Sequence, residues 1–216
     1  MKEQKKKAKL FSAKYLFVDF IRVTGALPTF LWYRPKFIYE NQAAKKRIRG
    51  GALLVANHNG FYDPIYLMTA VWYRRHRFIC NERFFDSKAG WFLKRVLCIP
   101  IDTENTGFRT MREINDHLSN GEIVSIFPEG HINDGSGELR SFKSGMALMA
   151  MRAKVPIVPV YVREHTPRYS RLRVVIGEAV DIGRLYGERP TMADIEEVTN
   201  LIFEKESELK ELAFRR

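Results

Sequence analysis

The chain has 216 residues, 45% of them hydrophobic, which is enough for one compact domain with a substantial core. Its composition excludes a collagen-like, a disordered and a disulfide-scaffold protein, and its two cysteines, Cys80 and Cys98, form no CxxC motif, which favours a reduced environment. The net charge of +11 favours attraction to a polyanion, which could be a nucleic acid, a membrane surface or a phosphorylated substrate, although each basic run can also be a solvated face.

The N-terminal segment combines a lysine-rich start with an apolar stretch. Residues 15–33 contain Asp19 and Arg22, and the longest uncharged piece is shorter than the roughly 20 residues of a membrane-spanning helix. The apolar side chains share one helical face, which predicts an amphipathic helix that is interrupted near Pro28 and resumes over residues 29–33. Such a pair of helices can lie in the plane of an anionic membrane or pack on the protein's own core, and this segment alone leaves both possibilities open.

Beyond residue 34, strand and helix patterns alternate. The expected strands are residues 36–40, 52–57, 77–82, 98–102, 122–127, 155–162 and 171–180. The expected helices are residues 64–73, 87–97, 107–118 and 144–153, followed by a last helix that opens with a capping box of Thr191 and Asp194. This order predicts an α/β fold, a mostly parallel mixed sheet covered by helices on both faces, with an N-terminal amphipathic helical pair. Active sites in such sheets form where strands end and loops begin.

Two loops carry polar groups directly after an apolar strand. In the first, "NHNGFYD" (residues 57–63), His58 can accept a proton near neutral pH and Asp63 can orient its ring through the other nitrogen. A turn through Asn59 and Gly60 would bring Asp63 back towards His58. Two purely structural roles stay open: Asp63 before Pro64 is a good helix N-cap, and His58 could simply satisfy backbone groups at a strand end.

Several other chemistries lack their sequence signature. The chain contains no GxSxG nucleophile elbow, no P-loop and no GxGxxG motif, and its five histidines have no metal-ligand spacing. What remains is a general base that deprotonates a substrate hydroxyl, which then attacks an activated carbonyl.

The second loop opens with "FPEG" (residues 127–130). Together with Asn57, His58 and Asp63, with "NERFF…GWFL…CIPID" (residues 81–102) and with "VPIVPVYV" (residues 155–162), it resembles the glycerolipid acyltransferase superfamily of NHxxxxD type. The best-known branch of that superfamily makes phosphatidic acid from 1-acylglycerol 3-phosphate.

The resemblance implies a reaction and roles for residues. An acyl group would pass from acyl-CoA or acyl carrier protein to a lysolipid hydroxyl, with His58 as general base and Asp63 as its orienting group. Asn57, Glu129 and Gly130 would help to bind the acceptor, and no metal or other cofactor is expected. Residues 1–34 would be a basic tail with membrane-docking helices and residues 35–216 the acyltransferase domain, at the cytoplasmic face of an anionic membrane, without a nucleic-acid partner.

The sequence departs from the family pattern at two positions. Thr103 and Ile132 stand where family members often carry arginines that are associated with binding the acceptor's phosphate. Arg109, Arg140 or Lys143 could supply the missing charge, because a guanidinium or an ammonium group binds phosphate well. Otherwise the acceptor lacks a phosphomonoester.

Two other function classes compete with acyl transfer. The positive charge suits a nucleic-acid-binding protein, although the basic clusters match no RRM, KH or zinc pattern. An α/β lipid hydrolase of the serine type would need a nucleophile elbow, which the sequence lacks.

Overall fold

A computed structural model describes residues 15–102, 107–133, 138–163, 171–182 and 190–215. Its centre is a seven-stranded sheet in the order β1-β7-β6-β2-β5-β3-β4. The strands are β1 (Lys36–Tyr39), β2 (Ala52–Ala56), β3 (His76–Asn81), β4 (Ile99–Ile101), β5 (Ile123–Ile126), β6 (Ile157–Arg163) and β7 (Arg173–Ile176). All neighbouring strands are parallel except β6 and β7, so five strands from β6 to β4 end at the same edge. The mostly parallel mixed sheet expected from the sequence is confirmed.

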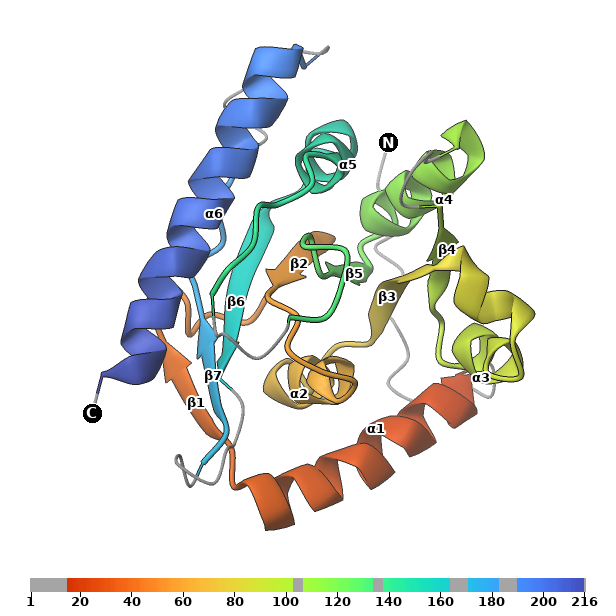
Figure 1. The fold of residues 1–216 in the computed structure, drawn as a ribbon, viewed down its shortest axis with the longest axis vertical. Coiled ribbons are helices and arrows are strands. Elements are labelled where there is room, and N and C mark those ends of the chain that lie inside the picture. Colours follow the sequence, from red (N-terminus) through yellow and green to blue (C-terminus); the bar gives the residue numbers. More distant parts are fainter. Residues whose placement is uncertain (1–14, 103–106, 134–137, 164–170, 183–189, 216) are drawn as a thin grey trace, which may run out of the picture.

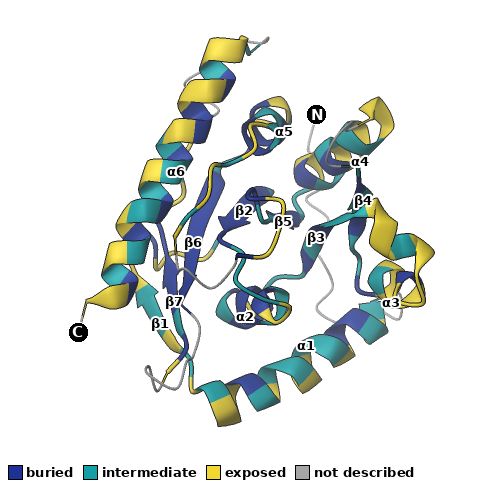
Figure 2. Ribbon diagram, in the orientation of Figure 1, coloured by how far each residue is buried: buried dark blue, intermediate teal, exposed yellow. Residues whose placement is uncertain are grey.

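Helices cover both faces of this sheet (Figure 1). They are α1 (Leu16–Pro28), η2 (Thr29–Tyr33), α2 (Asp63–Ala70), η3 (Glu82–Asp86), α3 (Gly90–Arg95), α4 (Phe108–Ser119), α5 (Gly145–Ala153) and α6 (Met192–Phe214). One core lies between the sheet and α4, α5 and α6, and another lies between the sheet and α2. The central strands β2 and β6 are buried on both sides, as continuous apolar runs predict for parallel strands (Figure 2).

The last helix begins where the sequence predicts. Thr191 Oγ1 accepts a hydrogen bond of 3.2 Å from the Asp194 backbone N–H, and Asp194 Oδ2 accepts one of 2.7 Å from the Thr191 N–H. These two bonds satisfy amides that the helix itself leaves free.

Two expected helices differ in the structure. The helix expected over residues 87–97 is shorter, and a 3-10 turn, η3, precedes it, because Ser87 is extended and separates the two. The helix expected to be interrupted near Pro28 continues instead. Pro28 and Thr29 both have right-handed helical backbone angles, and the α-helix α1 changes there into the π-helical turn η2 without a break.

The amphipathic helix α1 lies across α2 with its polar side inward. Asp19 is 9% exposed and forms an ion pair of 2.7 Å with Arg75, while Gly25 allows a close approach to Ile65 of α2. The outward side is apolar, with Phe20 61% and Val23 71% exposed. The helix therefore packs on the protein through Asp19, Gly25 and Val18, which is 1% exposed, while most of its predicted apolar face stays exposed.

Candidate active site

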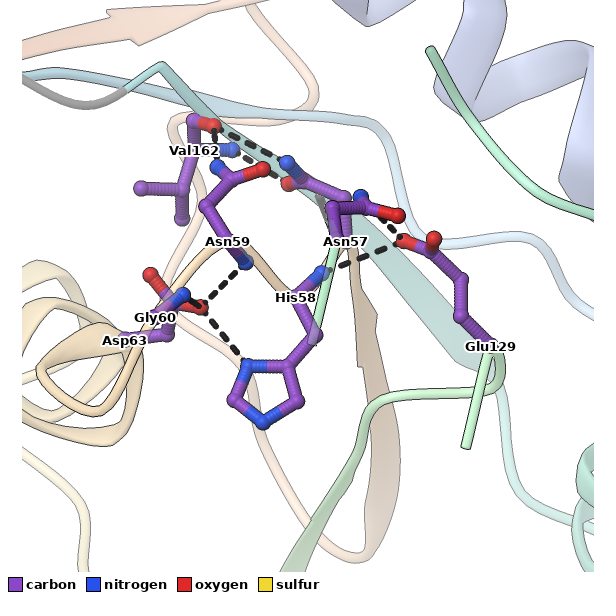
Figure 3. Close-up of polar contacts among 8 residues, drawn as sticks. Asn57, His58, Asn59, Gly60, Asp63, Glu129 and Val162 are labelled. Carbon is purple, nitrogen blue, oxygen red and sulfur yellow. Dashed lines mark hydrogen bonds and ion pairs between the residues drawn. The ribbon is translucent and has the colours of Figure 1, made fainter. Parts of the chain in front are cut away.

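His58 and Asp63 meet at the edge of the sheet where β2 ends. The Nδ1 atom of His58 lies 2.8 Å from Oδ2 of Asp63, and the same oxygen accepts the backbone N–H groups of Asn59 at 2.7 Å and Gly60 at 2.9 Å (Figure 3). Asp63 is fully buried, whereas the His58 side chain is 19% exposed. The turn through Asn59 and Gly60 thus brings the carboxylate back to the imidazole, as the sequence predicts.

The position of Asp63 differs from a simple helix cap. Asp63 is the first residue of α2, Tyr62 is the N-cap residue, and Pro64 lies in the first turn. Its carboxylate binds the amides of the preceding loop instead of those of the helix. The N-cap interpretation is therefore wrong in detail, and the carboxylate is available to hold the ring of His58.

The backbone of His58 is held by the second loop. Its N–H donates to Oε1 of Glu129 at 3.1 Å, and its carbonyl accepts from the N–H of Asn133 at 2.7 Å. Phe127 stacks on the imidazole with ring centroids 4.2 Å apart and planes 15° apart. The two polar loops identified in the sequence therefore form one unit around a single histidine.

Glu129 is a buried supporting residue. It is 1% exposed, and besides His58 it accepts hydrogen bonds from the side chain of Asn133 and from the backbone N–H of Arg140. Burial raises the pKa of Glu129 above its usual range, and the surrounding N–H donors oppose that rise. Its carboxylate therefore holds the backbone of His58 and the second loop, and the contact with the acceptor expected from the sequence stays a prediction.

Asn57 also serves the scaffold. Its Nδ2 donates to the Val162 carbonyl at 3.0 Å, and its Oδ1 accepts from the Val162 N–H at 2.7 Å (Figure 3). This pair ties the end of β2 to β6 with a side chain that is 1% exposed. Both polar ends of Asn57 bind the backbone of Val162, and its expected contact with the acceptor stays a prediction.

Cationic side chains surround the turn at Gly130. Gly130 has a φ of +76°, and a methyl group added to it would lie 3.0 Å from Cε and 3.2 Å from Nζ of Lys143. Nearby, the Arg140 guanidinium lies 2.8 Å from Nε2 of His131. The structure therefore places Lys143 beside the expected site, and the left-handed φ of Gly130 favours glycine at this turn.

Arg109 is not joined to this cluster. It is exposed in the first turn of α4, and no contact within the described ranges links it to His58, Asp63 or Glu129. Thr103 lies outside the described residues.

The sequence did not single out Phe127 as a ring partner, Asn133 as a loop anchor or Val162 as the partner of Asn57. A position of Phe127 near His58 can be expected once β2 and β5 are known to be parallel neighbours, because the two polar loops begin where these strands end.

The contact with Asp63 distinguishes the two ring nitrogens of His58. With Nδ1 held by Asp63, Nε2 is the atom that can take a proton, and in Figure 3 it points away from the labelled groups. Among the described residues no group of three or more His, Cys, Asp or Glu side chains could hold a metal ion. In the same part of the chain, every helix is too short or too polar to cross a bilayer.

Known proteins share this sequence pattern and this fold. A 1-acyl-sn-glycerol-3-phosphate acyltransferase from Bacillus subtilis is 28% identical over 171 residues, which are 75% of this chain and 84% of that protein. The enzyme of that name from Streptococcus pneumoniae is 28% identical over 68% of this chain, but the match spans only 53% of its own length.

The crystal structure of the 1-acyl-sn-glycerophosphate (LPA) acyltransferase PlsC from Thermotoga maritima matches the fold with a TM-score of 0.68. It has 21% identity over 92% of this chain and 80% of that one. The family model described as Acyltransferase matches residues 36–163, a range that contains both polar loops and every strand except β7. The chain therefore belongs to the Acyltransferase family, and it is an acyltransferase.

Proposed function

We propose that this enzyme transfers a fatty acyl group from an acyl thioester to the free hydroxyl of 1-acylglycerol 3-phosphate, giving phosphatidic acid, with His58 as the general base. The observation that carries the proposal is the 2.8 Å contact between Nδ1 of His58 and the buried carboxylate of Asp63, which leaves Nε2 as the proton acceptor. The names of the relatives support this choice of acceptor.

In the proposed reaction, His58 takes one proton from the acceptor hydroxyl and later gives it to the leaving thiolate. Nε2 of His58 takes the proton from the acceptor hydroxyl while its oxygen bonds to the thioester carbonyl carbon. When the tetrahedral intermediate collapses, the carbon–sulfur bond breaks and the leaving thiolate takes the proton back from the imidazolium. The Asp63 carboxylate stabilises that imidazolium, and backbone N–H groups of the two loops are the proposed donors to the oxyanion.

The acceptor's phosphate would bind near Gly130. Lys143 passes over this glycine and Arg140 lies beside His131, so positive charge gathers on the loop that also holds His58. Both side chains can bind a phosphomonoester, which makes them our candidates to replace the arginines missing at Thr103 and Ile132. The competing proposal is an acceptor without a phosphomonoester, such as another lysolipid or a glycolipid.

Residues 1–34 would dock the enzyme on a membrane and residues 35–216 would form the acyltransferase domain. The outward apolar face of α1 can enter the interface to a depth of roughly 5–10 Å, and the lysine-rich start suits anionic lipid. The enzyme would then be a peripheral protein of the cytoplasmic face, where acyl-CoA or acyl carrier protein supplies the donor.

An acyl-transfer assay with defined lipids tests the acceptor. Purified protein is incubated with vesicles that contain lysophosphatidate together with lysolipids lacking a phosphomonoester, and with acyl-CoA or acylated carrier protein. Mass spectrometry should detect phosphatidate as the main product. Acylation confined to the other lysolipids would establish the competing acceptor, and the absence of any acylated lipid would contradict the proposal.

Variants of the two cations sharpen this test. Lys143→Met and Arg140→Met should each raise the KM for lysophosphatidate about tenfold, because each removes one phosphate contact. The matched control is Lys210→Met on α6, on the opposite face of the sheet from α2, which should leave the KM unchanged. If the variants and the control behave alike, Lys143 and Arg140 do not bind the phosphate.

A further inference from the structure

The two cysteines, distant in sequence, meet on neighbouring strands. Cys80 lies in β3 and Cys98 directly precedes β4, and the parallel register pairs Cys80 with Pro100. Residues two apart on a strand point to the same face, so both thiols lie on the α2 face of the sheet, close enough for each to shift the pKa of the other. Both residues are free thiols and partly exposed.

This pair lies next to the candidate active site. The register of β3 and β5 pairs Phe78 with Ser125, which puts Cys80 level with Phe127. The Phe127 ring stacks on His58 on one side and on Phe78, at 6.4 Å, on the other. The thiols therefore lie at the same sheet edge as the imidazole, one strand beyond the ring that covers it.

The surroundings favour a thiolate on one of the two sulfurs. The hydrogen bond from the Cys98 thiol lowers the pKa of Cys80 to about 7, against the effect of burial, with smaller contributions from the charge of His58 and from the Asn81 N–H. The Cys98 thiol, as the donor in that bond, has its pKa raised. A thiolate near neutral pH beside a second thiol is the arrangement found in reactive dithiols.

We propose that Cys80 and Cys98 form a reactive dithiol site at the edge of the active site, which a peroxide oxidises to a disulfide. The Cys80 thiolate attacks a peroxide oxygen: a sulfur–oxygen bond forms, the oxygen–oxygen bond breaks, and the hydroxide released takes a proton to become water. Cys98 then loses its proton and attacks the Cys80 sulfur, a disulfide forms, and the sulfenic oxygen leaves as a second water. This chemistry does not depend on the identity of the acyl acceptor.

Modification of Cys80 should also lower the rate of acyl transfer. The register of β3 and β5 puts a group added to its sulfur beside Phe127, whose ring covers the imidazole of His58. Alkylation at Cys80 therefore hinders transfer by displacing that ring.

Peptide mapping of the wild-type protein tests the site without any variant. Limiting iodoacetamide at pH 7 should label Cys80 about tenfold faster than an unperturbed thiol, with a rate that reaches half its maximum near pH 7. Hydrogen peroxide followed by non-reducing digestion should yield a peptide pair joined by Cys80 and Cys98, which dithiothreitol separates. Slow labelling of Cys80, or oxidation that leaves both thiols unlinked, would overturn the proposal.

Two serine variants separate the roles of the sulfurs. In Cys98→Ser, oxidation should stop at a sulfenic acid on Cys80 that dimedone traps, whereas Cys80→Ser should show neither fast alkylation nor dimedone adduct. Iodoacetamide should lower acyl transfer in the wild-type enzyme and leave the Cys80→Ser enzyme unaffected. Equal inhibition of both would overturn the link between this thiol and the active site.

Discussion

At the scale of single residues, His58 is held from three directions. Asp63 binds its ring, Phe127 covers it, and the loop through Glu129 and Asn133 binds its backbone on both sides. The pairing with Asp63 could be predicted because the two residues are five positions apart. The partners on the second loop could not, since Glu129 is 71 positions away and a sequence pattern does not report such contacts.

The charge of Asp63 should be essential for turnover. In Asp63→Asn an amide keeps the shape of the carboxylate but cannot stabilise an imidazolium, so kcat should fall about 100- to 10,000-fold. Steady-state kinetics and thermal unfolding, measured together, separate this effect from misfolding. Turnover within a few-fold of the wild type, in a folded variant, would show that the ring needs no anion.

Gly130 should tolerate no side chain. In Gly130→Ala the new methyl group meets Lys143 Cε at 3.0 Å in a left-handed backbone conformation, which should destabilise the protein by about 1–2 kcal/mol. Gly107→Ala is the matched control, because its methyl group meets no atom within 4 Å and its φ is −63°. Equal melting temperatures of the two variants would contradict this account of the turn.

Among the helices and strands, α1 shows how much of an amphipathic helix can be predicted from sequence. Its periodicity was sufficient to predict the helix and the two faces. The side that turns inward depends on Arg75, 56 residues beyond Asp19, and the ion pair between them draws the polar side against the protein. The apolar side is left to face outward.

Removing the apolar face should release the enzyme from membranes. Val23→Glu with Leu27→Glu places two charges on side chains that are 71% and 61% exposed, and binding to anionic vesicles should fall at least about tenfold. Met192→Glu, at an equally exposed position at the start of α6, is the control that should bind like the wild type. Sedimentation with vesicles measures this, and undiminished binding of the double variant would exclude α1 as the docking element.

Glu206 in α6 makes stability depend on pH. It is fully buried, and burial, together with the charge of Glu129, raises its pKa well above the usual value, while the backbone N–H of Asn57 opposes that rise. The folded state therefore favours the protonated form, so this group lowers stability increasingly as the pH rises above about 4.5.

Glu206→Gln should remove that penalty. At pH 8 the variant should be more stable than the wild type by about 1–3 kcal/mol, and near pH 4 the two should converge. Urea unfolding at both pH values measures the difference. A difference that grows as the pH falls would contradict the assignment of a neutral, buried carboxyl group.

At the scale of the whole molecule, the sequence predicted the fold class and most elements but not the strand order. Alternating apolar runs and helical periods are local, so they indicate strands, helices and a parallel sheet. The order is set by pairings between distant segments, such as β2 with β6, and by the reversal of β7. That order brings the ends of β2, β5 and β3 together, and with them His58, Phe127 and Cys80.

The role of His58 as general base is tested by the rate of acyl transfer from acyl-CoA to lysophosphatidate in the His58→Gln variant. His117→Gln, which replaces a partly exposed histidine on α4, is the control. We predict a loss of at least about 1,000-fold in kcat for His58→Gln and a rate close to that of the wild type for the control. A folded His58→Gln enzyme that retains most of its turnover would show that the imidazole is not the base.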